Sequence, residues 1–333
     1  MKHQAGSPGD WRCAAIESVR AALVPWRGQL RPLAAQAVDH LDAVLGAGDG
    51  SQIAALAVPV AVHAGLRGSH PPPWLLAAAG ATYLAWSVLD NDMDGDPPRF
   101  WSESSAAERS IGAHVLIATA AAQAPIGAVP SLVPTLAQIY LDMVATVTDG
   151  QLRAEDRLDE QTAPEDVTAG IEARSGAMLA GFADLTAVAA GTGADIRWAV
   201  RRFGRELAMA RQLVNDITEL ESGRTSDLRN ETATMTAAFA LQRAAAADRA
   251  ALVDRLRAAA FDESLRRQMI DGELQPALVD TRMLARLHLV GAARAAESFV
   301  GSEKGRAVSD ALIDYTLGPL VDGAITRAQA GNA

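Results

Sequence analysis

The sequence predicts an all-α protein, built as a single-domain helical bundle. Two observations lead to this prediction: alanine dominates a chain that is 49% hydrophobic but only 5% aromatic, and runs of β-branched residues are scarce. Alanine, leucine, arginine and glutamate are strong helix formers. A chain of 333 residues has room for one large domain or two. Because no strand pattern or repeat interrupts it, we expect one domain over 1–333, with 1–9 as a flexible N-terminus.

Nearly every long segment has helical character, and Gly, Pro and Ser separate the segments. Proline is favoured in the first turn of a helix, where acidic residues are also stabilising. Pro32 and Pro73 lie near expected first turns, and two acidic residues follow Pro164. The Gly- and Pro-rich stretches 46–50 and 68–73 are expected loops within the domain. In chain order, the expected helices are 10–23, 30–46, 51–66, 73–91, 104–123, 130–150, 164–190, 194–221, 232–258, 262–270, 276–298 and 303–328.

Charge and cysteine content exclude several classes of protein. The net charge of −10 argues against a nucleic-acid partner, which would require a basic face. Cys13 is the only cysteine, so neither an intramolecular disulfide nor a four-cysteine zinc site is possible. The N-terminus lacks the apolar centre of a signal peptide, and the most apolar segments, such as 53–66, are too short to span a bilayer. We therefore expect a cytoplasmic protein without a transmembrane segment.

An acidic cluster ends the helix expected over 73–91, within the stretch WSVLDNDMDGDPPRFW. Asp90 and Asp94 are four residues apart and Asn91 and Asp94 three apart, which places each pair on one helical face. Like charges at this spacing destabilise a helix, and the negative end of the helix dipole adds to the cost. A divalent cation such as Mg²⁺, which prefers oxygen ligands, would offset it. The alternative is an acidic turn in solvent.

A second cluster of the same kind ends the helix expected over 194–221, in RQLVNDITELESGRTSDLRN. Asn215 and Glu219 share a face, Asp216 lies beside Asn215, and Asp227 follows in a polar loop. Two such clusters could face each other across the cavity of a bundle, where their metal ions would hold an anionic substrate.

These two motifs resemble those of the trans-type isoprenoid diphosphate synthases and of the terpene synthases that share their fold. DNDMD at 90–94 is similar to the first DDxxD motif, with Asn in the second place. FGRELAMARQLVNDITE at 203–219 is similar to the GRxLGxAFQxxDDxxD context of the second motif and keeps Gln212.

Three further segments follow the family pattern in the same order. VTDGQL at 147–152 resembles its Gly-Gln stretch. EARSGAML at 172–179 resembles its Lys-Thr-Gly segment, with Arg174 in the lysine position. SDLRNETATMTAAFAL at 226–241 resembles the segment that follows the second motif. The resemblance covers about residues 26 to 241.

The resemblance implies a helical bundle around a central cavity, a homodimer, a prenyl diphosphate substrate and Mg²⁺. Lewis-acid catalysis of allylic C–O cleavage is the implied mechanism. The implied metal ligands are Asp90, Asn91, Asp94, Asn215, Asp216 and Glu219, with Asp90, Asp94, Asn215 and Glu219 as the catalytic set. The implied diphosphate-binding residues are Arg99, Arg174, Gln212 and Asp227.

Aromatic side chains are expected to shield the resulting carbocation from water. Trp86 lies about one helical turn before Asp90 and Tyr83 about two, and Phe182 lies about two turns after Arg174. These three are candidates for the cavity wall, although packing in the core is the commoner role of such residues.

Several cationic residues of the family pattern are replaced in this sequence, and the replacements affect which reaction is expected. Gly28 and Gln29 occupy the places of a Lys-Arg pair, Phe100 replaces the second arginine after the first motif, and Thr232 replaces a lysine. A diphosphate needs several cationic donors, and this sequence lacks most of those expected at the site for the acceptor diphosphate. The expected activity is therefore that of a Mg²⁺-dependent terpene synthase, a lyase releasing a cyclic or linear terpene.

Two alternatives remain open. One is a prenyltransferase that couples a prenyl diphosphate to another acceptor, or couples two small prenyl diphosphates if Arg27 and Arg31 compensate. The other is a non-catalytic partner subunit of such an enzyme, against which the retention of both acidic clusters argues.

Overall fold

The computed structural model describes residues 54–93, 104–153 and 157–301, together with the single positions 21, 306 and 310. Throughout this part of the chain the structure is helical, and the one β-type pairing within it is an isolated bridge between Arg157 and Thr232. The all-α prediction is confirmed. Asp94, Arg99, and the helices expected over 10–23, 30–46 and 303–328 lie outside the described ranges, apart from those single positions.

The chain divides into two compact units, and each is described by itself. The first contains residues 1–143, 179–201 and 295–312; the second contains residues 144–178, 202–294 and 313–333. The prediction of one domain over 1–333 remains a prediction.

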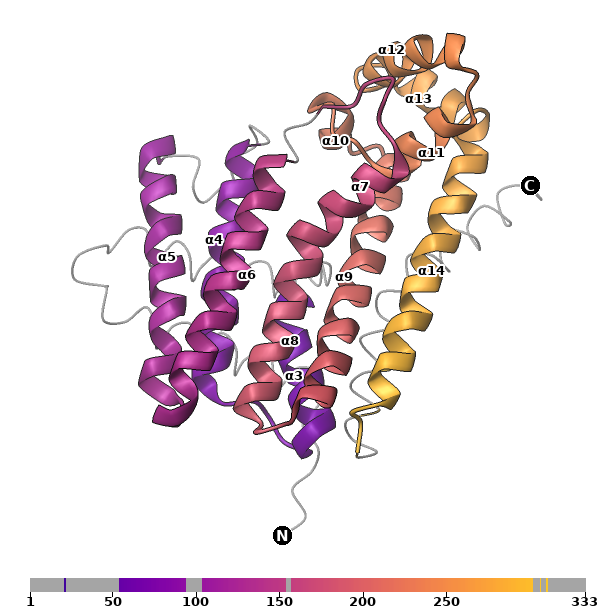
Figure 1. Ribbon diagram of the computed structural model, residues 1–333. Helices are drawn as coiled ribbons and strands as arrows, with labels where there is room; N and C mark the ends of the chain where they lie inside the picture. Colours follow the sequence, from indigo (N-terminus) through magenta and orange to yellow (C-terminus); the bar gives the residue numbers. More distant parts are fainter. Residues whose placement is uncertain are drawn as a thin grey trace. The chain divides into compact units, whose positions relative to one another are not determined.

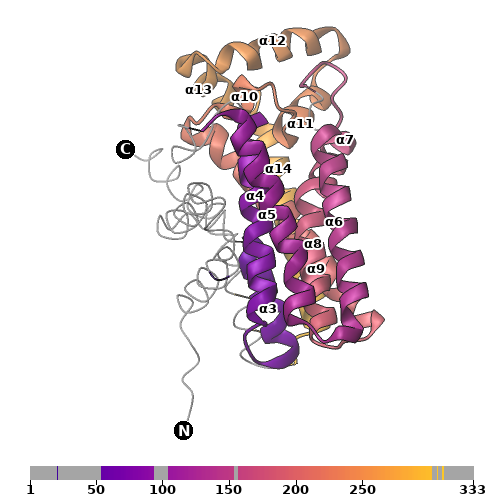
Figure 2. The same ribbon diagram turned by 90° about the vertical axis from the view of Figure 1, so that its left-hand side faces the viewer.

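In the first unit, α4 (Pro73–Met93) packs against both α3 (Ala54–Arg67) and α5 (Ala106–Gly127), as Figures 1 and 2 show. A capping box starts α5. The backbone amide of Ser105 donates to the Glu108 carboxylate, and the backbone amide of Glu108 donates to the Ser105 hydroxyl. Gly127, at the other end of α5, lies so close to Trp74 that a Cβ there would be 2.3 Å from the indole. The capping box thus stabilises the first turn of α5, and the close contact with Trp74 fixes the other end of α5 on α4.

Of the helices that the structure describes, α5 alone is long and apolar enough to cross a membrane, by length and composition. This is weak evidence, because the core helix of a soluble protein passes the same test. The prediction of no transmembrane segment underestimated the apolar length of 106–127, and it remains a prediction.

A short 3₁₀ turn, η4 (Pro130–Leu132), leads into α6 (Val133–Arg153). The next helical stretch, predicted as one helix over 164–190, runs through α7 (Pro164–Ile171), a π-helical turn η5 (Glu172–Gly176) and α8 (Ala177–Ala189). The long helix α9 (Ala194–Ser222) follows. In the first unit, Arg197 of α9 donates through Nε and Nη2 to the buried Asp184 of α8, at 2.7 and 2.9 Å, and this bidentate pair joins the two helices.

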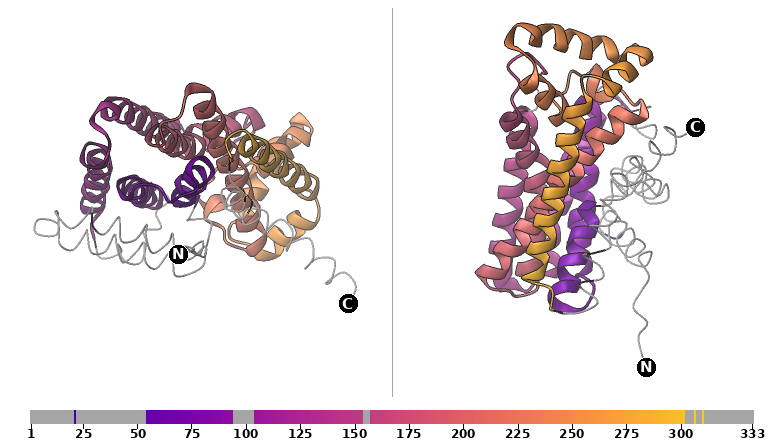
Figure 3. Two further views of the ribbon diagram at one scale, coloured as in Figure 1. Left: turned by 90° about the horizontal axis from the view of Figure 1, so that it is seen from below. Right: turned by 90° about the vertical axis from the view of Figure 1, so that its right-hand side faces the viewer.

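In the second unit, short helices gather around the C-terminal end of α9 and the N-terminal end of α14 (Gln275–Glu297), as Figures 1 and 3 show. They are α10 (Ser226–Arg229), α11 (Met235–Arg243), the 3₁₀ turn η6 (Ala246–Asp248), α12 (Arg249–Ala259) and α13 (Glu263–Asp271).

The prediction of one helix over 232–258 is wrong. The chain leaves the α-helical conformation after Arg243 and resumes it at Arg249. The break lets Leu241 of α11 and Leu252 and Leu256 of α12 enter the same hydrophobic core. Packing therefore overrides the helix propensity of the alanine-rich run 244–247. The four-residue helix α10 was not predicted either.

Within the second unit, a polar pair joins α9 to α14. The Glu206 carboxylate accepts from Nδ1 of His288 at 2.6 Å, and Gly291 makes room for it, since a Cβ there would be 3.0 Å from Glu206 Cδ. The hydrogen bond from His288 lowers the pKa of Glu206, aided by the charges of Arg205 and Arg202.

Replacing Glu206 by glutamine is expected to lower the free energy of unfolding by about 1–2 kcal/mol at pH 7, because the carboxylate's hydrogen bond from His288 and its attraction to Arg205 and Arg202 are lost. Since the folded-state pKa lies below the ordinary 4.5, the contribution is full above that value and is lost as the pH falls through the folded value. Urea unfolding of both proteins at about pH 7 and pH 4 measures it. Glu263→Gln, in an exposed pair with Arg267, should cost only a few tenths of a kcal/mol. A difference for Glu206→Gln that does not shrink at low pH would contradict the assignment.

Candidate functional site

The second acidic cluster occupies the last two turns of α9. Asp216 is buried, whereas Asn215 and Glu219 are half-buried. Asp216 and Glu219 are three residues apart and thus share a helical face with Gln212. All of these residues belong to the second unit.

A polar relay fixes the Asp216 side chain. The Gln212 amide nitrogen donates to Asp216 Oδ1 at 2.9 Å, and the Gln212 oxygen accepts from the Ser175 hydroxyl at 3.4 Å. A backbone hydrogen bond from Met235 also reaches the Asp216 carboxyl. The relay therefore connects the π-helical turn η5 to the acidic end of α9.

Burial raises the pKa of Asp216 to about 6, and the nearby charge of Glu219 adds to the rise. The hydrogen bond from Gln212, the positive charge of Arg174 and the Met235 amide act in the opposite direction. The carboxylates of Asp216 and Glu219 thus lie close together in an environment partly shielded from water. A cation would relieve both the burial of charge and the repulsion between the two groups.

Glu219 holds the start of α10. Its Oε1 accepts from the Ser226 hydroxyl at 2.5 Å and from the Asp227 amide at 2.8 Å. The sequence analysis named Asp227 as a diphosphate-binding residue, and this stays a prediction; the structure shows its backbone amide bound to Glu219. The loop that carries Asp227 is therefore tied to the acidic cluster.

The π-helical turn η5 carries Arg174 and Ser175. π-Helical turns are uncommon in proteins, and those that do occur are often found at functional sites. Gly150 of α6 is buried beside this turn, and a Cβ at Gly150 would be 2.7 Å from the Cβ and 2.8 Å from the backbone carbon of Ala173. Only glycine lets α6 approach η5 this closely. Arg174 donates from Nε to the Gly170 carbonyl at 3.3 Å, and its charge acts on Asp216.

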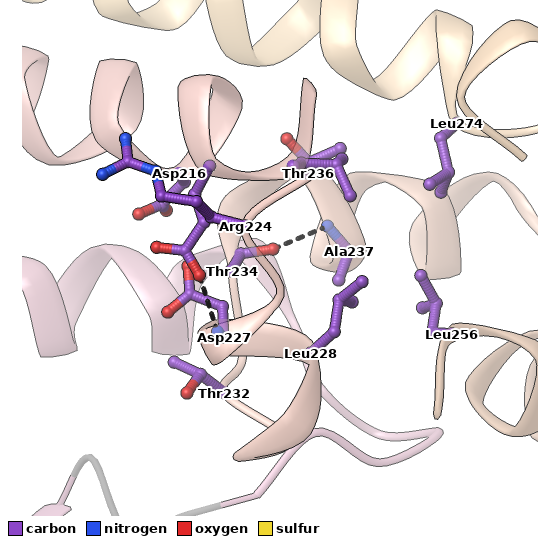
Figure 4. Close-up of a pocket in the computed structure, with 12 residues that line it drawn as sticks. Asp216, Arg224, Asp227, Leu228, Thr232, Thr234, Thr236, Ala237, Leu256 and Leu274 are labelled. Atoms are coloured by element: carbon purple, nitrogen blue, oxygen red, sulfur yellow. Dashed lines mark hydrogen bonds between the residues drawn. The ribbon is translucent and has the colours of Figure 1, made fainter. Parts of the chain in front are cut away.

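A pocket opens beside the cluster, and Figure 4 shows its two sides. Asp216, Arg224, Asp227 and Thr232 gather at one side, and Leu228, Leu256 and Leu274 at the other. The remaining lining residues are Glu219, Leu220, Thr234, Thr236 and Ala237. The pocket combines carboxylates and a guanidinium with an apolar wall.

Arg224 is the charged lining residue that the sequence analysis missed. It is exposed and lies in the turn between α9 and α10, where Gly223 has a positive φ of 83°. The Gly-Arg pair just after an acidic cluster was the available signal, because a glycine in the left-handed region often ends a helix. The sequence analysis instead selected Arg99 and Arg174 as cations.

The first acidic cluster ends α4 in the first unit. Asp90 is exposed and Asn91 half-buried, while their neighbour Asp92 pairs with Nε of Arg109 at the start of α5. One charge of this cluster is thus neutralised by the protein itself. Asp94 and Arg99, the remaining predicted members, lie outside the described part of the chain.

The three predicted cavity residues also belong to the first unit. Phe182 is completely buried and Tyr83 is 9% exposed. Trp86 is half-buried, and its buried Nε1 has no hydrogen-bond partner. Phe182 is part of the hydrophobic core, and its place in the cavity wall stays a prediction.

The donor set of the second cluster fits a hard divalent cation. Two carboxylates and the Asn215 amide oxygen lie within about one turn, and hard cations take such oxygen ligands. Within 54–93, 104–153 and 157–301, no group of three or more His, Cys, Asp or Glu side chains is arranged to hold a metal ion on its own. A cation here would need the amide oxygen or further ligands, such as substrate phosphates.

Comparison with solved structures identifies the fold. A geranylgeranyl pyrophosphate synthetase from Pyrococcus horikoshii superposes with a TM-score of 0.76 at 17% identity, covering 91% of this chain and 94% of that one. A polyprenyl synthetase from Streptomyces coelicolor gives 0.71 at 20% identity, covering 92% and 98%. A polyprenyl synthase from Caulobacter crescentus, complexed with calcium and isoprenyl diphosphate, gives 0.68 at 20% identity, covering 91% and 97%.

No protein-family model and no curated protein matches this sequence. The likeness is therefore one of structure: the chain has the all-α fold of the isoprenoid diphosphate synthases, as the sequence motifs predicted.

Proposed function

We propose that this protein is a divalent-cation-dependent prenyltransferase that acts on a prenyl diphosphate. The observation that carries the proposal is the pocket at the end of α9, where Asp216, Glu219 and Asp227 meet Arg224. The solved structures compared above are polyprenyl and geranylgeranyl diphosphate synthases, which favours prenyl transfer over the lyase activity expected from the sequence.

The carboxylate and amide oxygens of the two motifs would hold divalent cations. Asn215, Asp216 and Glu219 offer oxygen ligands in the second unit, and Asp90, Asn91 and Asp94 are the corresponding candidates from the first motif. A bound Mg²⁺ supplies Lewis acidity toward the diphosphate oxygens. The Gln212–Ser175 relay keeps Asp216 in one orientation, so that its carboxylate does not have to reorganise during the reaction.

Arginines would hold the diphosphate oxygens. Arg224 lines the pocket, Arg174 lies near enough to influence Asp216, and Arg99 is the third candidate. A guanidinium offers paired N–H donors that match phosphate oxygens. These charges stabilise the negative charge that develops as the C–O bond of the substrate breaks.

The bond that breaks is the allylic C–O bond, and its electron pair leaves with the diphosphate. The allylic cation is then captured by an electron-rich acceptor, and the loss of a proton completes the transfer. Tyr83, Trp86 and Phe182 are the candidates for shielding the cation from water, since aromatic faces stabilise positive charge.

A second candidate, a terpene synthase that uses no acceptor, is favoured by the lost cations. Thr232, which replaces a lysine of the related pattern, lines the pocket, and Gly28, Gln29 and Phe100 replace three further cations. An acceptor other than isopentenyl diphosphate would account for the same changes, because a neutral acceptor needs no basic site.

Product analysis distinguishes these candidates. The protein is incubated with Mg²⁺ and geranyl, farnesyl or geranylgeranyl diphosphate, with and without isopentenyl diphosphate, and products are analysed by gas chromatography–mass spectrometry before and after phosphatase treatment. A longer prenyl chain that requires isopentenyl diphosphate supports the transferase. A hydrocarbon or alcohol formed from one diphosphate alone, before phosphatase treatment, supports the terpene synthase instead.

A further inference from the structure

We propose that Arg266 of α13 is a positioning residue for the pocket, because it holds the turn after α9 in the conformation that brings Arg224 to the pocket. The inference rests on the proposed function, in which Arg224 holds diphosphate oxygens.

The Arg266 guanidinium occupies the place where a side chain at Gly223 would begin. Its φ of 83° lies in the left-handed region, and a Cβ there would be 2.9 Å from Nη2 and 3.7 Å from Cζ of Arg266. The Arg266 guanidinium therefore packs directly against the backbone of this turn. The backbone conformation favours glycine here, and a Cβ would in addition displace the end of the Arg266 side chain.

The environment of Arg266 is unusual for an arginine. Arg266 is only 8% exposed, and within the described ranges its guanidinium makes no ion pair or hydrogen bond. Its neighbour Arg267 is exposed and pairs with Glu263. Burying a cation without a counter-ion is unfavourable. The carbonyl groups at the C-terminal end of α9 carry partial negative charge, which compensates Arg266 in part.

The geometry connects Arg266 to the pocket through a single residue. Gly223 is followed by Arg224, so the backbone angles of Gly223 set the direction in which Arg224 leaves the turn. Glycine is the residue with the most backbone freedom, and the guanidinium packed against it restricts that freedom. Removal of Arg266 should let the turn vary and should misplace the Arg224 guanidinium.

Isothermal titration of the full chain with inorganic pyrophosphate in the presence of Mg²⁺ tests the proposal. Arg266→Met is expected to weaken pyrophosphate binding about tenfold, the order of magnitude seen when an orienting partner of a ligand-binding group is lost. Arg267→Met is the matched control, one residue away on the same helix but exposed, and should bind as the wild type does. Arg266→Lys, which keeps the charge but not the planar group, should restore binding only in part.

The double variant shows whether Arg266 acts through Arg224. If it does, Arg266→Met has no further effect in an Arg224→Met background, whereas a general loss of structure would weaken both backgrounds equally and overturn the proposal. Arg266→Lys serves as the test if Arg266→Met does not fold, since it should still bind pyrophosphate less tightly than the wild type does. Unchanged binding in Arg266→Met overturns the positioning role alone. A wild-type protein that does not bind pyrophosphate with Mg²⁺ overturns the proposed function itself.

Discussion

Replacing Asp216 by asparagine is expected to reduce the turnover of a prenyl diphosphate by a factor on the order of a hundred to a thousand, the usual cost of removing one group from a preorganised electrostatic site. Asparagine keeps the shape of the side chain and an oxygen that can accept from Gln212 and Met235, so the fold should survive. The substitution removes only the negative charge offered to a cation. Steady-state release of diphosphate by purified variant and wild-type protein measures the effect.

The same substitution should stabilise the metal-free protein at pH 7, by roughly 2 kcal/mol, because it removes the cost of burying an ionised carboxylate. The pKa of Asp216 is raised from 3.8 to about 6. The contribution of this group to stability is therefore fully present below about pH 4 and is lost as the pH rises through about 6. Thermal unfolding in the presence of a chelator should show a higher Tm for the variant at pH 7, with a smaller difference at pH 4.

Asp195→Asn provides the control on the same helix, since Asp195 is exposed in the first turn of α9. It should leave turnover unchanged. If Asp216→Asn kept wild-type turnover, or if it destabilised the protein at pH 7, the role given to this carboxylate would be wrong.

Gly150→Ala is expected to lower the free energy of unfolding by about 2 kcal/mol, because the new methyl group would overlap the backbone of Ala173, which cannot move aside as a flexible side chain could. The displaced segment is η5, which carries Arg174 and Ser175. We therefore also expect pyrophosphate affinity in the presence of Mg²⁺ to fall about tenfold. Urea unfolding and calorimetric titration measure the two effects.

Gly170→Ala is the matched control, because Gly170 lies in α7 just before η5 and a Cβ there meets nothing within 4 Å. Alanine is the better helix former, so this variant should gain up to about 1 kcal/mol and keep its affinity. If both variants behaved alike, the close approach of α6 to η5 would not position the site.

The helices that could be predicted closely are those with clear end signals. The segments 73–91 and 194–221 correspond to α4 and α9 with ends within two residues, because a proline starts the first and a glycine-containing turn follows the second. The run 232–258 gave no such signal, and the break between α11 and α12 arises from packing that only the folded chain reveals.

The candidate site also has parts that could be predicted from the sequence and parts that could not. Asn215, Asp216 and Glu219 could be found because their spacing follows the helical period. The relay from Ser175 to Gln212 joins residues 37 positions apart, and the pairing of Asp92 with Arg109 spans 17. Neither distance has a periodic signature. The π-helical turn was also unpredictable, since one inserted residue in a helix leaves no distinct pattern of apolar positions.

The cleavage of the allylic C–O bond is the central claim, and ³¹P nuclear magnetic resonance measures it most directly. The full chain is incubated with each prenyl diphosphate and Mg²⁺, with and without isopentenyl diphosphate. We predict the appearance of inorganic diphosphate from at least one substrate, abolished by a chelator and strongly reduced in Asp216→Asn. A folded protein that released no diphosphate from any of these substrates, with or without the acceptor, would contradict the account.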